Sequence, residues 1–429
     1  MSSNYSNSLN DHNSLLNIPN QPINTSNPKY KNFNIHNTYK NNNDSNVQRR
    51  NYVDIKFSVP KRYEIIKLLG KGSYGVVCSA RDKNIKNGDY VLAIKKITNI
   101  FNKEILLKRA IRELKFMFYF QGHKNIVNLV NVEIIFNHPF DGLYCYQELI
   151  DYDLAKVIHS NVVFTEFHIQ WFTYQILCGI KYIHSADVIH RDLKPGNILC
   201  TIYGTLKICD FGLARGIGKS QRNVQKSLRN DINIGPDVVP HITNYVATRW
   251  YRAPELMLSN KPYTMSIDMW AIGCILAEFY HRRPIFMGKD SIHQVSEIIK
   301  YLGTPNEQLL KQFGSIRSWN LLNNITTTTR NYTGQRKYAH DWKEVFPFAC
   351  NLGLNLLSKL LIWNPVERLT AEKALEHPFL SPVRRKNDEP NCPHGSFEFK
   401  YELELNSMSK LREYLISEVI QYRNNRNSG

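Results

Sequence analysis

The stretch His190-Arg191-Asp192-Leu193-Lys194-Pro195-Gly196-Asn197 decides the fold, together with Asp210-Phe211-Gly212, whose aspartate lies thirteen residues after that asparagine. Carboxylate and amide oxygens are the ligands that Mg²⁺ takes in proteins, and a carboxylate held in place can also accept a proton. Either tripeptide alone could fall by chance in an unrelated loop. In this order and at this spacing they indicate one site with a base, a cation and two metal ligands.

These residues resemble the catalytic loop and the metal-binding motif of protein kinases. The resemblance implies that Asp192 accepts the proton of the substrate hydroxyl and that Lys194 reaches the transferred phosphoryl group. It also implies that Asn197 and Asp210 hold the Mg²⁺ ions that neutralise the phosphates of ATP. The fold expected is α+β and two-lobed, with a small β-rich N-lobe and a larger α-helical C-lobe.

A glycine-rich stretch upstream fits the same family: Leu69-Gly70-Lys71-Gly72-Ser73-Tyr74-Gly75-Val76-Val77. A dinucleotide fingerprint with this glycine spacing would open a helix, whereas this stretch continues as a strand. Because glycine has no Cβ, the turn can close over phosphates. Lys95, which ends the strand-like residues 91–95, would pair with the α- and β-phosphates. An exposed, solvated lysine is the alternative.

Residues 103–118 are expected to form a helix, because apolar residues recur at three- and four-residue steps: Leu106, Leu107, Ala110, Leu114 and Met117. Glu113, rather than Glu104, is our choice for the carboxylate that holds Lys95, since it can point away from the packed face. A charge on the helix surface is the alternative. The resemblance also makes Asp268 a backbone anchor for the catalytic loop and pairs Glu255 of Ala253-Pro254-Glu255 with Arg368.

Adenine recognition follows from the same comparison. Gln147 stands at the gatekeeper position, with a satisfied buried polar side chain as its alternative, and the backbone of Glu148 and Ile150 would meet the edge of the base. Asp153 would meet the ribose. The complete set assigned to ATP binding is Leu69, Gly70, Lys71, Gly72, Ser73, Tyr74, Gly75, Val76, Val77, Ala93, Lys95, Gln147, Glu148, Ile150, Asp153 and Leu199.

Residues 243–255 resemble the activation lip of the mitogen-activated protein kinase family, with Thr243 and Tyr245 as its phosphorylated switch. Each phosphate would add about two negative charges and order the segment where arginines are in reach. An ordinary loop is the alternative for an isolated Thr-x-Tyr. The resemblance assigns phosphothreonine to Arg112, Arg191 and Arg215, and phosphotyrosine to Arg249 and Arg252.

Three further stretches narrow the resemblance to the sporulation-specific branch of this family in budding yeasts: Asn244 in the switch, residues 101–110 and residues 144–156. The match runs from about residue 63 to the C-terminal helix. The domains expected are a kinase domain at 63–380, with its N-lobe at about 63–150 and its C-lobe at about 151–380, and an extension at 381–429. Residues 165–184 should be a helix capped by Thr165.

Composition indicates which parts of the chain fold, the state of its cysteines, and whether it binds membranes or nucleic acid. Residues 1 to about 55 are rich in Asn and Ser and are expected to be disordered. The eight cysteines lack metal-binding spacing, which predicts reduced intracellular thiols; Cys209 is either a reactive cleft thiol or buried filler. No run approaches the length of a membrane span. The net charge of +18 is spread along the chain, which favours a solvated surface over a stripe that binds nucleic acid.

Two stretches depart from the family. Residues 216–241 lengthen the lip, and we expect them to be mobile and to tune access by the activator. In residues 384–390, Arg385 replaces an acid of the family's docking patch and only Asp388 and Glu389 match, so attraction for basic docking peptides should be weakened. The remaining tail shows helical spacing, which is typical of the family's C-terminal extension or of an ordinary surface helix.

The sequence therefore predicts a serine/threonine kinase that uses ATP and Mg²⁺, is directed at Ser/Thr followed by Pro, and acts in spore wall assembly during sporulation and meiosis. Its expected partners are protein substrates with Ser/Thr-Pro sites and an upstream activating kinase or activator protein, with no specific nucleic acid. A monomer inside the cell, in the cytoplasm with the nucleus as a second compartment, is expected. The alternatives are a cyclin-dependent-like kinase and a pseudokinase scaffold.

Overall fold

In a computed structural model of the protein, the structure describes residues 30–39, 51–72, 75–85, 90–217, 249–259, 264–314, 318, 320, 322, 340–398 and 404–427. Contacts within the chain divide it into two units. Unit 1 comprises Met1–Leu107, Val130–Leu149 and Arg412–Gly429, and unit 2 comprises Lys108–Leu129 and Ile150–Leu411. Residues 108–129, which the sequence analysis placed in the N-lobe, therefore belong to unit 2. No helix among the described residues is long and apolar enough to cross a membrane.

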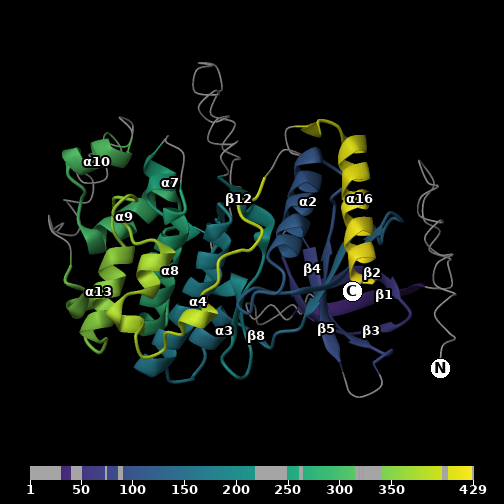
Figure 1. Cartoon of the computed structure of the whole chain (residues 1–429), viewed down its shortest axis with the longest axis horizontal. Coiled ribbons are helices and arrows are strands. Elements are labelled where there is room, and N and C mark those ends of the chain that lie inside the picture. Colours follow the sequence, from purple (N-terminus) through teal and green to yellow (C-terminus); the bar gives the residue numbers. More distant parts are fainter. Residues whose placement is uncertain are drawn as a thin grey trace, which may run out of the picture. The chain divides into compact units, whose positions relative to one another are not determined.

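Unit 1 is built on a five-stranded sheet with the order β3-β4-β5-β7-β6; Figure 1 labels β3, β4 and β5 of this sheet. The pairs β3/β4, β4/β5 and β5/β7 are antiparallel. Valine and isoleucine are frequent in these strands, as is typical of half-buried pleated surfaces. The bounds are β3 (Tyr63–Lys71), β4 (Gly75–Asp82), β5 (Val91–Ile97), β6 (Leu129–Ile135) and β7 (Gly142–Glu148).

The register of the sheet separates its two faces. Lys95 lies opposite Val77 and Cys145, and Ala93 lies opposite Gln147. Because directly opposed residues point to the same side, these side chains share one face. The other face forms the hydrophobic core of unit 1, whose buried members are Phe57, Val59, Tyr63, Val76, Cys78, Ala80, Leu92, Ile94, Ile135, Tyr144 and Tyr146.

The expectation that residues 1 to about 55 have no fold is wrong for residues 30–39 and 51–55, the part of this segment that the structure describes. Strand β1 (Tyr30–Tyr39) pairs antiparallel with β2 (Asn51–Pro60). The end of β2 is anchored because Phe57 and Val59 are fully buried, and the Lys96 ammonium donates to the carbonyl oxygen of Lys56 at 2.9 Å. Residues 53–59 alternate apolar and polar side chains, which is a strand pattern that the Asn- and Ser-rich composition of the tail obscured.

Helix α16 (Met408–Asn427) confirms the helical spacing predicted for the tail. Its residues from 412 onward belong to unit 1. There the Arg412 guanidinium lies over the Phe101 ring at 4.9 Å and the Phe136 ring at 5.2 Å. Arg423 lies 3.7 Å from the carboxylate of Glu133, whose pKa burial raises above its ordinary value.

Unit 2 is mainly helical. The helix predicted at residues 165–184 is α4 (Glu166–Ser185), and the Thr165 hydroxyl accepts a hydrogen bond from the His168 N–H as its cap. Buried Trp270 lies on α8 (Ser266–His281). The other helices are α2 (Glu104–Tyr119), which begins in unit 1, α3 (Leu154–Ile158), α7 (Glu255–Leu258), α9 (Ser291–Leu302), α10 (Glu307–Phe313), α12 (Trp342–Val345), α13 (Asn351–Leu360) and α14 (Ala371–Leu375).

Short strands and turns in unit 2 carry the chemistry-bearing residues. They pair as the sheets β11-β10-β8 and β12-β9. Leu199 lies opposite Asp153 in the first of these sheets. The bounds are β8 (Tyr152–Asp153), β9 (Val188–Ile189), β10 (Ile198–Cys200), β11 (Leu206–Ile208) and β12 (Arg215–Gly216), with single turns η2 (Pro195–Asn197) and η3 (Phe211–Leu213).

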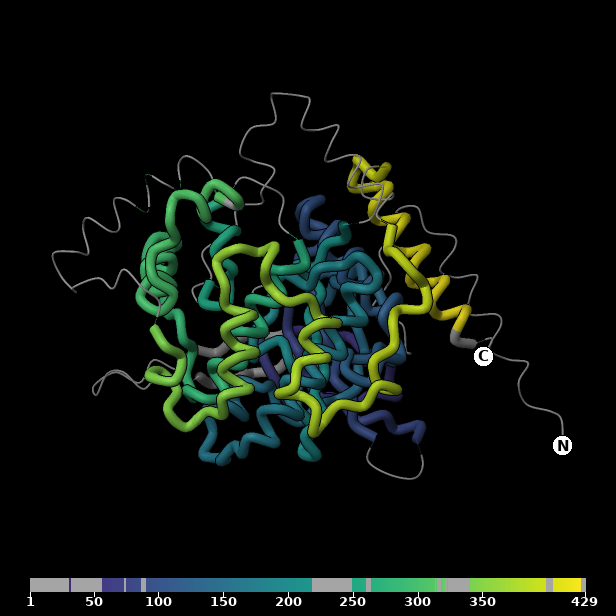
Figure 2. The backbone as a smooth tube through the Cα atoms, turned by 60° about the vertical axis from the view of Figure 1, so that its left-hand side comes forward, coloured from purple at the N-terminus to yellow at the C-terminus, as the bar shows by residue number. Residues whose placement is uncertain are grey.

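The chain after η5 (Pro378–Leu380) runs back along α4, as the yellow-green segment of Figures 1 and 2 shows. The Tyr174 hydroxyl donates to the carbonyl oxygen of Arg385 at 2.7 Å, and the Cys392 N–H donates to the Ser185 hydroxyl at 2.8 Å. The Phe397 N–H then donates to the carbonyl oxygen of Ala186 at 2.9 Å. This segment includes the turn η6 (Lys386–Asp388).

Candidate active site

The loop that follows β9 is anchored by the fully buried carboxylate of Asp268 on α8. It accepts hydrogen bonds from the backbone N–H groups of His190 at 2.8 Å and Arg191 at 2.9 Å, and its Oδ2 lies 2.9 Å from His184 Nε2. Burial alone would raise the pKa of Asp268, but the His184 hydrogen bond and the neighbouring charges hold it below its ordinary value. The anchor predicted from the resemblance is confirmed.

His190 connects this loop to the Asp210 motif. Its Nδ1 accepts from the backbone N–H of Asp192 at 3.3 Å, which leaves Nε2 to donate to the carbonyl oxygen of Cys209 at 3.0 Å. The Cys209 N–H in turn donates to the carbonyl oxygen of Asn197 at 3.0 Å. The two motifs, thirteen residues apart in the sequence, are therefore joined by short hydrogen bonds.

Asp192 lies at the centre of a polar group. Its Oδ2 accepts from the Lys194 ammonium and from the Asn197 amide, each at 2.8 Å. The same amide donates to the Asp192 carbonyl oxygen at 2.8 Å. Asp192 is only 7% exposed, and its Oδ1 has no hydrogen-bond partner among the residues that the structure describes. One carboxylate oxygen is thus fixed in place while the other is left as an acceptor.

Each of the two motifs contains one residue with a strained backbone. Arg191 has φ = 69° and Asp210 has φ = 64°, both in the left-handed region that non-glycine residues rarely adopt. Such conformations cost about 1–3 kcal/mol and persist where surrounding contacts impose them. The Arg191 N–H is held by Asp268, and the Phe211 ring beyond Asp210 is buried against the His190 ring at 5.3 Å.

Phe211 also packs against α2. Its ring centroid lies 6.1 Å from that of Phe116 and 5.6 Å from that of Phe120. Glu113 lies on the same helix and is buried. The pairing of Glu113 with Lys95 stays a prediction, because Lys95 belongs to unit 1.

The end of the activation lip is held by a bidentate ion pair. Arg368 Nη1 and Nη2 donate to the two carboxylate oxygens of Glu255, at 2.8 and 3.1 Å, and the same two nitrogens also donate to the carbonyl oxygens of Ser266 and Ile362. The pair predicted from the resemblance is confirmed. Both side chains are buried, and their charges compensate each other.

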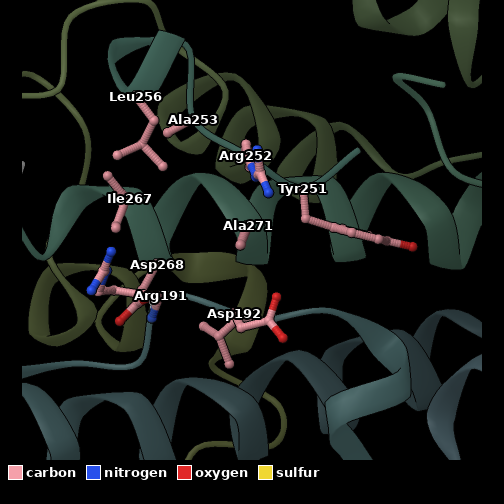
Figure 3. A pocket seen from close by; sticks show the side chains of 10 residues that line it. Arg191, Asp192, Tyr251, Arg252, Ala253, Leu256, Ile267, Asp268 and Ala271 are labelled. Atoms are coloured by element: carbon pink, nitrogen blue, oxygen red, sulfur yellow. Dashed lines mark hydrogen bonds between the residues drawn. The ribbon is translucent and has the colours of Figure 1, made fainter. Parts of the chain in front are cut away.

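Three arginines gather beside the catalytic loop. Arg191, Asp192, Tyr251, Arg252 and Asp268 contribute to a small pocket between the loop, the lip end and α8 (Figure 3). Burial lowers the pKa of Arg252, and the positive charges of Arg249 and Arg191 lower it further, while Asp192 opposes them. Such a concentration of guanidinium groups favours binding of an anion.

One anchor of the lip was missed by the sequence analysis. The Tyr251 hydroxyl donates to Glu278 Oε2 at 2.6 Å, and His159 Nε2 lies 3.0 Å from Glu278 Oε1. Glu278 is fully buried, and burial raises its pKa despite these hydrogen bonds. The sequence contained one signal for this anchor, because Glu278 is an acidic residue inside the apolar run of α8, and buried acids usually have a partner.

The predicted ATP-binding residues fall in both units. Those in unit 1 include the shared face of Val77, Ala93 and Gln147 with Lys95. Gly75 packs so closely on β5 that a Cβ there would lie 2.5 Å from the carbonyl oxygen of Lys96. Ile150, Asp153 and Leu199 belong to unit 2. Ser73, Tyr74, the switch residues Thr243 and Tyr245, and residues 218–241 of the insert lie outside the described residues.

The fold and the catalytic-loop geometry define the class of the protein as a protein kinase, and a family model described as "Protein kinase domain" matches residues 63–380. This confirms the predicted fold class. The sporulation-specific mitogen-activated protein kinase SMK1 of Saccharomyces cerevisiae is 59% identical over 376 residues, covering 88% of this chain and 92% of that protein.

Two further relatives carry the same family name. Mitogen-activated protein kinase SLT2/MPK1 of Saccharomyces cerevisiae is 45% identical, covering 86% of this chain and 71% of that protein. Mitogen-activated protein kinase mpkA of Aspergillus fumigatus is 44% identical, covering 86% of this chain and 80% of that protein. The chain therefore belongs to the mitogen-activated protein kinase family, whose members are ATP-dependent serine/threonine protein kinases.

Proposed function

We propose that this kinase transfers the γ-phosphate of ATP to Ser or Thr residues that precede Pro, with Asp192 as the general base. The observation that carries the proposal is the asymmetry of the Asp192 carboxylate. Lys194 and Asn197 hold Oδ2, which leaves the buried Oδ1 able to accept the proton of a substrate hydroxyl. Lys194 also brings a cation to the place where negative charge develops during transfer.

Asn197 and Asp210 are the proposed ligands of Mg²⁺. Both partners of the Asn197 Nδ2 are acceptors, so the amide nitrogen must face Asp192 and Oδ1 faces away from it. An amide oxygen and a carboxylate are the hard ligands that Mg²⁺ takes, so the donor set fits the ion. When bound, ATP and Mg²⁺ would supply the phosphoryl group and neutralise its charge.

The proposed nucleotide contacts in unit 1 lie on one face of its sheet, which carries Lys95, Val77, Ala93 and Gln147. Lys95 would bind the α- and β-phosphates, and the other three would contact adenine. The glycines at 70, 72 and 75 would approach the phosphates, and Glu113 would orient Lys95. The kinase domain is proposed to span residues 63–380, with an extension at 381–429.

Activation is proposed to require phosphates on Thr243 and Tyr245. The cluster of Arg191, Arg249 and Arg252 supports this, because its mutual repulsion is relieved when an anion binds. Arg112 and Arg215 complete the proposed set of phosphate-binding arginines. The protein would act as a monomer that an upstream kinase or activator protein switches on.

The biological setting is proposed from the relative whose name describes it as sporulation-specific. On that basis the kinase would act in spore wall assembly during sporulation and meiosis, in the cytoplasm and the nucleus. A pseudokinase scaffold is the competing function, and turnover distinguishes the two.

Phosphate transfer to Ser-Pro and Ser-Ala peptides by protein purified from sporulating cells tests the proposal. We expect the Ser-Pro peptide to be preferred at least about tenfold in kcat/KM. Thr243→Ala and Tyr245→Phe should each lower kcat, whereas Tyr203→Phe, at a tyrosine that is 88% exposed, should not. Full activity without lip phosphates would contradict the switch, and absence of turnover in the phosphorylated protein would favour the scaffold.

A further inference from the structure

A basic surface lies where residues 384–389 cross α4 in unit 2. Tyr174 fixes the backbone of Arg385 by donating to its carbonyl oxygen and accepting from its N–H at 3.0 Å. The Arg385 guanidinium then lies over the ring of Trp171, 5.2 Å from its centroid. Lys386 is exposed beside it, and Lys181 stands further along α4.

The acidic residues of this segment are neutralised within the chain. Glu389 is bound by both Nε and Nη2 of Arg384, at 2.9 and 3.1 Å, and its side chain is only 8% exposed. Asp388 forms an ion pair with Lys124. Lys181, by contrast, donates to the uncharged carbonyl oxygen of Glu389, so that contact leaves its charge uncompensated. The surface therefore presents more positive than negative charge.

Three lysines lie close enough to buried His123 to affect its pKa. His123 is 4% exposed, its Nδ1 accepts from the Asn125 N–H at 3.1 Å, and its Nε2 has no partner among the described residues. Burial lowers the pKa of His123 to about 4, and the charges of Lys124, Lys207 and Lys181 act in the same direction. Three lysines thus converge on one side of this surface.

Cations outnumber anions among the charged groups that these contacts bring together. The cations are Lys124, Lys181, Lys207, Arg384, Arg385 and Lys386, and the anions are Asp388, Glu389 and, at the rim 3.9 Å from Arg384, Glu376. The excess of positive charge means that a basic segment would be repelled and an acidic one attracted.

We propose that this basic surface binds an acidic segment of a partner protein. Stacking on Trp171 orders the planar Arg385 guanidinium, so that less side-chain entropy is lost when it pairs with a carboxylate. Single-stranded nucleic acid fits less well, because base stacking needs an open aromatic face and Arg385 covers the face of Trp171. The surface is independent of the proposed catalytic residues.

The test uses the full-length protein and a fluorescein-labelled peptide of alternating Glu and Gly, with binding followed by fluorescence anisotropy. We expect Arg385→Glu/Lys386→Glu to raise the Kd about tenfold. The matched control Lys300→Glu/Lys311→Glu makes the same change of charge on α9 and α10, where both lysines already pair with glutamates of their own helices. It should change the Kd less than about twofold.

A second variant, Arg385→Gln/Lys386→Gln, keeps polar side chains but removes both charges, and it should raise the Kd about threefold with an unchanged melting temperature. If the charge-reversed variant fails to fold, this second variant still tests whether the positive charges of the surface are needed for binding. Equal weakening by the control and the surface variants would overturn the proposal. Two other results would also overturn the proposal. One is that a Lys-Gly peptide binds more tightly than the acidic peptide and that this binding is lost in Asp388→Asn. The other is that the surface variants lose binding of a single-stranded oligonucleotide but keep binding of the acidic peptide.

Discussion

Replacement of Asp268 by asparagine is expected to loosen the catalytic loop. Asparagine offers one acceptor and one donor where the carboxylate offers two acceptors. Its oxygen can keep the hydrogen bonds of His190 and His184, which share Oδ2, but its NH₂ group then faces the N–H of Arg191. The contact that is lost is therefore the one that holds the strained backbone of Arg191.

The expected loss of stability in Asp268→Asn follows from these contacts. An unsatisfied buried N–H costs about 1–3 kcal/mol, and the two remaining bonds each lose about 0.5–1 kcal/mol of charge assistance. Asp268→Asn should therefore lower the free energy of unfolding by about 3 kcal/mol and the melting temperature by about 3–5 °C, since the entropy of unfolding grows with chain length. Because Asp192 follows Arg191 directly, we expect kcat to fall about 100-fold once the loop relaxes.

Differential scanning calorimetry and steady-state kinetics measure the two effects. Asp290→Asn is the matched control, since Asp290 caps α9 by accepting from the His293 N–H and asparagine caps as well. That variant should stay within about 0.5 kcal/mol of the wild type. If Asp268→Asn melted at the wild-type temperature and kept its kcat, the account of the anchored loop would be refuted.

Three further predictions concern other contacts. Arg368→Ala leaves the Glu255 carboxylate buried without its partner, and urea unfolding should show a loss of about 3–5 kcal/mol. The pKa of Asp268 lies below its ordinary value of 3.8, so its carboxylate stabilises the fold above about pH 4, and this stabilisation is lost as the pH falls through the folded pKa. Calorimetry should therefore find that the difference in melting temperature between the wild type and Asp268→Asn becomes smaller in that pH range. Phe397→Ala removes a buried ring 4.8 Å from Phe116 on α2, so the free energy of unfolding should fall by about 3–5 kcal/mol and kcat about tenfold, whereas Phe348→Ala, at a 99% exposed residue, should change neither.

The contacts within unit 2 that the sequence predicted are those whose residues belong to recognisable motifs. Asp268 and Arg368 lie far from their partners in the sequence, yet the resemblance assigned both correctly. Thr165 and the apolar spacing of α4 were readable without any resemblance, since a cap and a 3.6-residue period are local signals.

Other features depend on the three-dimensional arrangement. The pairing of Glu278 with Tyr251 and His159 joins three separate segments, and only the presence of an acid in an apolar helix hinted at it. Strand β2 was missed because composition was given more weight than the alternation of residues 53–59, and β1 was missed with it because β1 pairs with β2. The neutralisation of Asp388 by Lys124 likewise needs the fold, because 264 residues separate them.

The central claim, that Asp192 is the base of an active kinase, is tested most directly by Asp192→Asn. Phosphate transfer and binding of a fluorescent ATP analogue should be measured on the same phosphorylated preparation. We expect kcat to fall by several orders of magnitude, about 10³-fold or more, while the Kd of the analogue changes less than about threefold. Transfer at the wild-type rate by this variant would contradict the account.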